Sequence, residues 1–168
     1  MNKILVTGAS GFIGRHTLPI LINKGFDVHA VSLHQQIAMP DITWHHVDLL
    51  NQTAREELMH RVRPTHVLHF GWIATPNIYW TSPLNDDWRI ATLDLHRIAR
   101  AQGVTRFVAA GSCAEYDWTQ GQCDEKTTAL MPLTPYGKAK ASCSLPAATT
   151  STASTERAIP TPHPSSFT

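Results

Sequence analysis

The sequence predicts an α/β protein with a doubly wound parallel sheet that is incomplete on its C-terminal side. Short apolar runs alternate with amphipathic stretches along residues 3–143, which is the rhythm of β-α-β units. The first apolar run passes directly into a glycine-rich turn. A chain of 168 residues, 42% of them hydrophobic, is long enough for one such domain with a buried core.

Three strands and two helices are predicted in the first half of the chain. The first apolar run ends at a glycine, as in a strand buried on both faces. Pro19 removes one hydrogen bond from the helix that follows. A glycine ends that helix and a proline follows the next one. The expected strands are residues 3–7, 28–32 and 42–47, and the expected helices are 12–24 and 53–63.

The second half continues the alternation with two strands and two helices. Pro83 opens a long helix that Gly103 ends, and Pro135 opens the last helix. Both prolines suit the first turn of a helix, where a backbone N–H has no partner. The expected strands are residues 65–70 and 105–110, and the expected helices are residues 83–102 and one that begins at Pro135.

The composition excludes several classes of function. Lys and Arg number 14 against 13 Asp and Glu, and no basic cluster could neutralise a row of phosphates, so we expect no nucleic-acid partner. No apolar stretch approaches the ~20 residues of a membrane span, so we expect a cytoplasmic protein with no membrane contact. The three cysteines form no Cys-x-x-Cys pair and should be reduced. His45 and His46 are adjacent on a strand and point to opposite faces, so we expect no metal site.

The composition changes abruptly after Cys143. Between residues 144 and 168, Ser, Thr, Pro and Ala fill 19 of 25 positions without an apolar period. We therefore expect a domain over residues 1–143 and a disordered tail over 144–168. The change also favours a chain that is truncated or frame-shifted after its last helix. An exposed sheet edge beside the last strand would then give marginal stability and self-association, for example as a homodimer.

The glycine-rich turn has the sequence Thr-Gly-Ala-Ser-Gly-Phe-Ile-Gly over residues 7–14. Its first glycine permits a sharp bend, its second lets the backbone approach a pyrophosphate, and its third lets the helix pack on the strand. Free N–H groups at the start of the helix face the anion. A plain strand-helix loop would share the glycines but not this context. The expected dinucleotide contacts are Gly8, Ser10, Gly11, Phe12, Ile13 and Gly14.

The end of the second strand decides which dinucleotide is preferred. An NAD-selective site normally places a carboxylate there to hold the ribose 2′-OH. This chain instead has Ser32, followed by Leu33 and His34, whereas Asp27 stands at the opposite end of the strand. Ser32 and His34 would tolerate a 2′-phosphate but include no arginine that favours one. Ser32 is an expected cofactor contact, and the choice between NAD and NADP stays open.

Tyr136 and Lys140 lie four residues apart on the last helix and hence on one face of it. A lysine ammonium near a phenol favours the phenolate and lowers its pKa from about 10 towards neutrality. Such a phenolate takes a proton from a hydroxyl group while the carbon gives hydride to a nicotinamide, or does the reverse on a ketone. Lys140 is also expected to hold the nicotinamide ribose. An ordinary surface helix is the alternative.

The Gly-x-x-Gly-x-x-Gly spacing resembles the turn of the extended short-chain dehydrogenase/reductases, the NAD-dependent epimerase/dehydratase family. The similarity extends to Ala-Ala-Gly-Ser-Cys-Ala-Glu-Tyr at residues 109–116 and to the Trp-rich loop over residues 74–83. These stretches look like a subgroup found among sugar-nucleotide and surface-polysaccharide enzymes. The resemblance implies a Rossmann-type fold, NAD or NADP as cofactor and a nucleotide sugar as substrate.

The resemblance also implies roles for four further residues. Ser112 matches the family's catalytic hydroxyl, which hydrogen-bonds the reacting oxygen, although a turn serine would look the same. Asp48 and the adjacent Leu49 match the third-strand end that contacts the adenine, although an Asp there also suits a plain helix cap. Gly71 matches a small residue packed beside the cofactor.

Three other residues near these motifs also have expected positions. Glu115 could serve as an extra acid-base group, but we expect it to face solvent. His69 is expected to fill space or to meet a backbone carbonyl. Trp88 stands about where many family members carry an Asn near the cofactor.

Three functions remain open from the sequence. The first is an epimerase, dehydratase or reductase of a nucleotide sugar that uses Tyr136, Lys140 and Ser112. The second is a non-catalytic protein that still binds NAD(P) but lacks a substrate domain. The third is a remnant without function.

Overall fold

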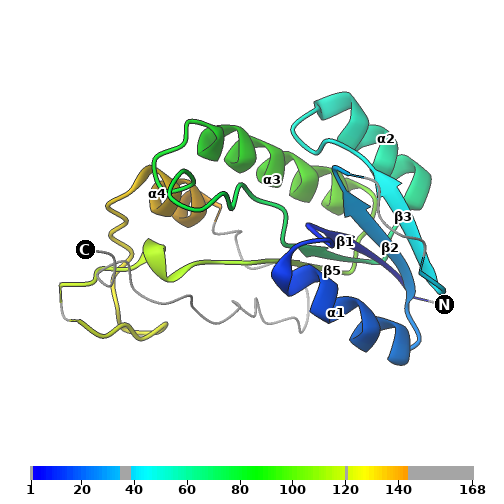
Figure 1. Cartoon of the computed structure of the whole chain (residues 1–168), viewed down its shortest axis with the longest axis horizontal. Coiled ribbons are helices and arrows are strands. Elements are labelled where there is room, and N and C mark those ends of the chain that lie inside the picture. Colours follow the sequence, from blue (N-terminus) through cyan, green and yellow to red (C-terminus); the bar gives the residue numbers. More distant parts are fainter. Residues whose placement is uncertain (1, 35–38, 120, 144–168) are drawn as a thin grey trace.

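Five parallel strands lie in the order β3-β2-β1-β4-β5 in the computed structural model, which describes residues 2–34, 39–119 and 121–143 (Figure 1). All four neighbouring pairs are parallel. The chain runs outward from β1 to β3 and then crosses to β4, so β1 and β4 flank the point where the strand order reverses. Ligands of such sheets bind at this point, outside the carboxyl ends of the strands.

Every predicted helix and strand is present, and its boundaries shift by one residue at most. One short helix, η1, was not predicted. The strands are β1 (Lys3–Thr7), β2 (Asp27–Ser32), β3 (Ile42–His46), β4 (His66–His69) and β5 (Arg106–Ala109). The helices are α1 (Phe12–Asn23), α2 (Gln52–Val62), α3 (Leu84–Ala101), η1 (Cys113–Glu115) and α4 (Pro135–Ser142).

The sheet is covered by helices on both faces, which confirms the predicted α/β fold of the Rossmann type. Helix α1 lies on one face, and α2 and α3 lie on the other (Figure 1). Each face has its own apolar cluster, because alternate residues of a strand point to opposite sides. The cluster under α1 includes Val6, Leu18 and Val28. The cluster under α2 and α3 includes Leu5, Leu58 and Leu95.

The helix ends follow the chemistry of their sequences. The Asn51 side chain accepts the Ala54 N–H at 3.0 Å and begins α2. The Thr134 hydroxyl accepts the Gly137 N–H at 3.0 Å and begins α4 in the same way. Pro19 is exposed and α1 continues through it without interruption. The position of Tyr136 and Lys140 is therefore set by a capped helix that packs against η1 and α3.

A buried ion pair joins α2 to α3. Arg55 is only 3% exposed, and its guanidinium lies 2.9 Å from Asp94 Oδ2. The same guanidinium donates a hydrogen bond to the carbonyl of Leu49, in the loop after β3. Breaking a buried pair of this kind leaves an uncompensated charge. The pair thereby ties two helices to a loop at the carboxyl edge of the sheet.

The tail predicted over residues 144–168 lies outside the described residues. Within the part of the chain that is described, helices long and apolar enough for a membrane span are absent.

Candidate cofactor and active site

The glycine-rich turn between β1 and α1 is built from close backbone contacts. Gly8 has a φ of +62°, and a Cβ there would lie 2.7 Å from the Gly71 backbone nitrogen. A Cβ on Gly14 would overlap the Gly8 carbonyl oxygen and lie 2.7 Å from Ala9 Cα. Both positions therefore require glycine, because the neighbouring atoms belong to the backbone and cannot swing away. The turn leaves the N-terminus of α1 facing the carboxyl edge of the sheet.

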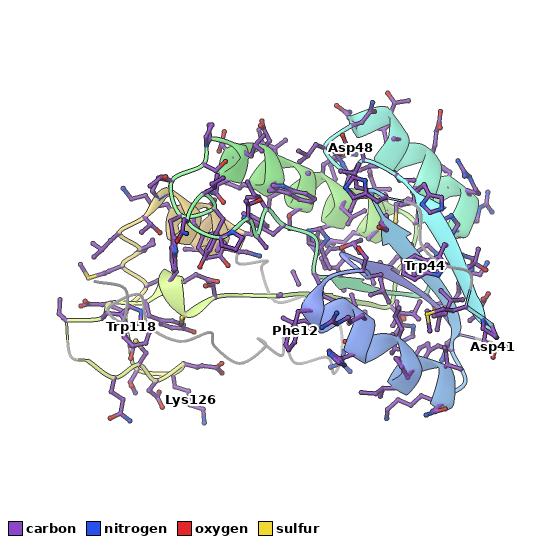
Figure 2. All side chains as sticks on the ribbon, in the orientation of Figure 1. Phe12, Asp41, Trp44, Asp48, Trp118 and Lys126 are labelled. Carbon is purple, nitrogen blue, oxygen red and sulfur yellow. The ribbon has the colours of Figure 1, made fainter. Side chains whose placement is uncertain are left out.

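A cavity of about 440 Å³ opens at this edge, and we call it the edge cavity. Figure 2 shows two of its lining residues, Phe12 from α1 and Asp48 from the loop after β3. All but one of the predicted cofactor contacts line it; Lys140 does not. Its predicted lining residues are Gly8, Ser10, Gly11, Phe12, Ile13, Gly14, Ser32, Asp48, Leu49 and Gly71.

One end of the edge cavity is formed by the ends of β2 and β3. The Ser32 hydroxyl donates to Ser10 Oγ at 3.1 Å, which joins the strand end to the glycine-rich turn. Asp48 Oδ1 accepts the Leu50 N–H at 2.9 Å, whereas Asn51 caps α2. Asp48 is therefore not the helix cap, and its carboxylate stands exposed at the cavity wall.

The other end is walled by two tryptophans. The resemblance placed Trp88 near the cofactor, but the place of Trp72 was not predicted. Trp72 and Trp88 both line the edge cavity, and their rings stack with centroids 6.3 Å apart. A Cβ on Gly71 would lie 3.3 Å from the Trp88 ring, so the small residue makes room for the indole. The abundance of Trp between residues 72 and 88 was the available signal, but only the tertiary contacts show which of them reach the cavity.

His69 is fully buried beneath this end of the cavity. Its Nδ1 lies 2.7 Å from Thr7 Oγ1 and its Nε2 lies 2.9 Å from Thr92 Oγ1. The expectation of a backbone carbonyl partner was wrong, because two threonine hydroxyls fill that role. Burial, followed by the charge of Lys140, lowers the pKa of His69 to about 3. The ring is therefore neutral at neutral pH, and the Thr7 hydroxyl is left to accept the Gly71 N–H at 3.1 Å.

We expect the free energy of unfolding to fall as the pH drops below about 6.5. Below that pH, His69 binds a proton in the unfolded chain but stays neutral in the folded protein. At a pH two units below that value the loss from His69 is about 3 kcal/mol. His69→Asn keeps an acceptor for Thr7 and cannot titrate, so its unfolding free energy should depend less on pH between 6.5 and 4.5. Urea titrations of both proteins measure this, and parallel pH dependences would contradict it.

Tyr136 lies on α4 with its phenol directed to the end of β5. The Ser112 side chain makes a hydrogen bond with it. Burial raises the pKa of Tyr136 above its ordinary value, and the bond with Ser112 offsets only part of this effect. The phenol is therefore protonated at neutral pH in this arrangement.

Lys140 lies one turn along α4 but turns towards different partners. Its Nζ donates to the Ala110 carbonyl at 3.0 Å and lies 3.9 Å from the centre of the Trp72 ring. Burial lowers the pKa of Lys140 to about 8. Its charge is not among the causes that shift the pKa of Tyr136. The expectation that Lys140 lowers this pKa was wrong for the described arrangement, because a carbonyl and an indole hold the ammonium.

An aromatic cluster surrounds the Tyr136 ring. The centroids of Tyr79, Trp80 and Trp72 lie 5.0, 5.5 and 6.3 Å from it, all edge-on. The indole N–H of Trp72 donates to Asn85 Oδ1 at 2.9 Å, and Asn85 is 1% exposed. Edge-on pairs of this kind fix ring orientation as well as bury area. The phenol is thus held in one position by its neighbours.

Glu115 is buried, at 3% exposure, and does not face solvent as the sequence suggested. Its Oε1 accepts the Ser112 N–H at 2.7 Å, while the Ser112 hydroxyl accepts the Ala114 N–H at 3.2 Å. This reciprocal cap turns the glutamate inward. Ser112 is therefore a turn serine and a partner of Tyr136 at once.

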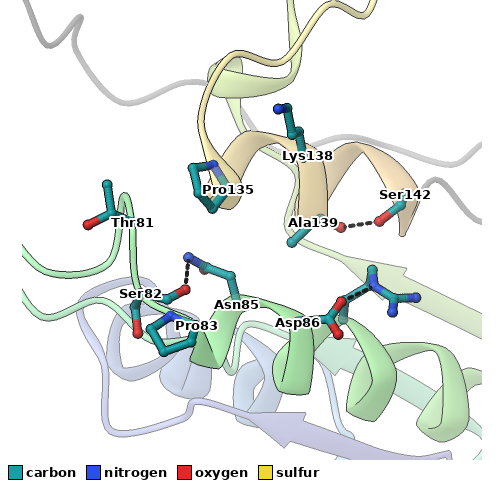
Figure 3. Close-up of a pocket in the computed structure, with 10 residues that line it drawn as sticks. Thr81, Ser82, Pro83, Asn85, Asp86, Pro135, Lys138, Ala139 and Ser142 are labelled. Atoms are coloured by element: carbon teal, nitrogen blue, oxygen red, sulfur yellow. Dashed lines mark hydrogen bonds and ion pairs between the residues drawn. The ribbon is translucent and has the colours of Figure 1, made fainter.

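A second hollow of about 410 Å³ lies between the starts of α3 and α4 (Figure 3). An Arg89–Asp86 ion pair with a 2.7 Å contact lies on its wall. It shares no lining residue with the edge cavity. Lys140 contacts two residues that line the edge cavity, Ala110 and Trp72.

Known proteins with similar sequences and structures include several epimerases. A UDP-glucose 4-epimerase of Rhizobium leguminosarum bv. trifolii is 28% identical over 144 residues, which cover 83% of this chain and 44% of that protein. The UDP-glucose 4-epimerase of Mus musculus is 29% identical over 161 residues, with 83% and 46% covered. The chain thus spans about half the length of the curated relatives it matches.

Solved structures give the same picture. The Thermus thermophilus UDP-glucose 4-epimerase complex with NAD superposes with a TM-score of 0.72 at 27% identity, covering 84% of this chain and 48% of that one. A UDP-Glc/GlcNAc 4-epimerase from Campylobacter jejuni reaches 0.76 at 21% identity, covering 85% and 47%, and supports the fold alone. The family model of the NAD dependent epimerase/dehydratase family matches residues 4–153. The chain belongs to the NAD dependent epimerase/dehydratase family.

Proposed function

We propose that the chain binds NAD or NADP in the edge cavity and acts on a nucleotide sugar as an epimerase, dehydratase or reductase. The observation that carries this proposal is the convergence of three features at one sheet edge. The glycine-rich turn and the ends of β2, β3 and β4 line the edge cavity, as does Ala110, which directly follows β5 and precedes Ser112, the hydrogen-bond partner of Tyr136. Family membership supports the reaction class, and the UDP-glucose 4-epimerases among the relatives support a UDP-hexose as substrate.

The residues present fit a nicotinamide dinucleotide. The neighbouring backbone lies so close to Gly8 and Gly14 that only glycine fits at these two positions of the turn. A volume of about 440 Å³ lies in the range of cofactor sites. The proposed cofactor contacts are Gly8, Ser10, Gly11, Phe12, Ile13, Gly14, Ser32, Asp48, Leu49, Gly71 and Lys140.

The chain's own residues would handle the proton of the sugar hydroxyl. When bound, the nicotinamide supplies the hydride acceptor or donor for the sugar carbon. Tyr136, protonated in the described arrangement, donates its O–H to a sugar oxygen when a ketone is reduced and takes the proton back when the alcohol is oxidised. Ser112 orients that oxygen by a hydrogen bond. Lys140 would hold the nicotinamide ribose.

A non-catalytic NAD(P)-binding protein is the second candidate. One observation favours it: Lys140, Tyr136 and Ser112 do not line the edge cavity, and Lys140 is held by Ala110 and Trp72. Binding without turnover distinguishes this candidate from the first.

The test of the cofactor site is a titration with NADH. Trp72 and Trp88 line the edge cavity, so bound nicotinamide should quench their emission and gain fluorescence by energy transfer. We expect a saturable signal that is reduced in the Trp72→Phe/Trp88→Phe protein. Trp44→Phe, on the far strand β3, is the matched control and should keep the signal. The absence of saturation in the unaltered chain would contradict the cofactor site.

The test of catalysis is conversion of UDP-glucose and UDP-galactose by the same chain, followed by chromatography of the products. Conversion with added NAD or NADP supports the enzyme. Saturable NADH binding without conversion of any nucleotide sugar in a wider panel supports the non-catalytic candidate instead.

A further inference from the structure

The adenosine-proximal end of the edge cavity, at the carboxyl end of β2, is built from hydroxyl groups. Ser32 ends β2, is only 5% exposed, and lines the cavity together with Ser10. The two hydroxyl oxygens lie 3.1 Å apart. The His34 N–H donates to Ser32 Oγ at 3.2 Å and fixes the hydroxyl from the other side. Since Ser32 donates to Ser10, the Ser10 hydroxyl keeps its own proton for a ligand at the cavity.

Negative charge is scarce at this end. Among the described lining residues the one carboxylate is Asp48, which belongs to the loop after β3 and not to the end of β2. Asp27 lies at the opposite end of β2, where it pairs with His29 at 3.4 Å. A carboxylate at the end of β2 is the group that holds a ribose 2′-OH and repels a 2′-phosphate. No residue of β2 therefore supplies a carboxylate that would hold the ribose 2′-OH or repel a 2′-phosphate.

A positive charge and a helix dipole lie near Phe12, another residue that lines the cavity. The Arg15 guanidinium lies 5.4 Å from the centre of the Phe12 ring, and Phe12 lines the cavity. The N-terminus of α1, which carries a partial positive charge, opens on the same space. A phosphate at this rim would meet donors and a favourable field.

We propose that the end of β2 accepts a 2′-phosphate, with Ser10 and Ser32 as the specificity-determining residues, so that NADP(H) binds nearly as tightly as NAD(H) or more tightly. This inference rests on the proposed cofactor site and adds the cofactor class to it. Ser10 donates to the phosphate, and Ser32 holds Ser10 in place.

The experiment titrates the unaltered chain with NADH and with NADPH by tryptophan energy transfer at one ionic strength. We expect dissociation constants within about tenfold of each other, or tighter NADPH binding. NADH binding more than about tenfold tighter than NADPH overturns the inference and leaves the proposed function standing. Failure of both nucleotides to bind overturns both proposals.

Ser32→Asp supplies the missing carboxylate and provides the second measurement. It should weaken NADPH binding relative to NADH by at least about tenfold. The carboxylate at the end of β2 would then repel the negatively charged 2′-phosphate. Ser142→Asp adds the same charge at an exposed position of α4 and should leave the ratio of the two constants unchanged. An equal ratio in the Ser32→Asp protein and the unaltered chain, with both folded by circular dichroism, would place the 2′ position elsewhere and overturn the inference.

Discussion

Tyr136→Phe should reduce turnover of a nucleotide sugar by about 10²–10⁴-fold while leaving NADH binding intact, since proton transfer by one positioned group contributes about this much. The ring and its edge-on contacts with Tyr79, Trp80 and Trp72 are kept. Only the hydroxyl that meets Ser112 is removed. The measurement is kcat with UDP-glucose in parallel with the NADH titration.

Two variants sharpen this prediction. Tyr79→Phe removes a hydroxyl from a ring that touches Tyr136 and should change kcat only slightly. Lys140→Met removes the ammonium but keeps an apolar stem, and should lower kcat and weaken NADH binding together. Equal activity of Tyr136→Phe and the unaltered chain would remove Tyr136 from the mechanism.

Gly14→Ala should destabilise the protein, although helix propensity alone predicts the reverse. Alanine in a helix interior is favoured over glycine by about 1 kcal/mol. The added Cβ, however, would overlap the Gly8 carbonyl oxygen and lie 2.7 Å from Ala9 Cα. Overpacking against atoms that cannot move costs up to about 3 kcal/mol, so the net loss is about 2 kcal/mol. Urea unfolding measures it, and NADH binding should weaken by at least about tenfold because the turn must shift.

Gly111→Ala is the matched control for this substitution. Its Cβ would lie 3.2 Å from Glu115 Oε1, at the end of a side chain that can adjust. The unfolding free energy should change by no more than about 1 kcal/mol. A stabilised Gly14→Ala protein would show that the turn is looser than its backbone contacts indicate.

The fold could be predicted from sequence because its signals are local. Apolar runs, glycine and proline terminators and the turn at residues 7–14 each act over a few neighbours. The same holds for the edge cavity, since in a parallel sheet every strand end arrives at one edge. Gly8, Ser32, Asp48 and Gly71 could therefore be placed together before any contact was known.

The orientation of single side chains could not be predicted in this way. Lys140 was expected beside Tyr136 from helical spacing, but its partners Ala110 and Trp72 come from two other segments. Glu115 was expected in solvent, but a reciprocal cap with Ser112 turns it inward. The partners of Lys140 come from distant segments, which helix periodicity does not encode. The Ser-x-x-Glu spacing of residues 112 and 115, by contrast, is a local capping pattern that could have indicated the inward glutamate.

Trp72 lies between the edge cavity and Lys140, so it can link ligand binding in the cavity to proton binding by Lys140. Trp72 lines the edge cavity, and the Lys140 ammonium lies 3.9 Å from the centre of its ring. A ligand that moves this ring on entering the cavity must also change the surroundings of Lys140, and so its proton affinity. Linkage is reciprocal, so the affinity of the cavity for that ligand then varies with pH through the titration of Lys140, whose pKa burial lowers to about 8.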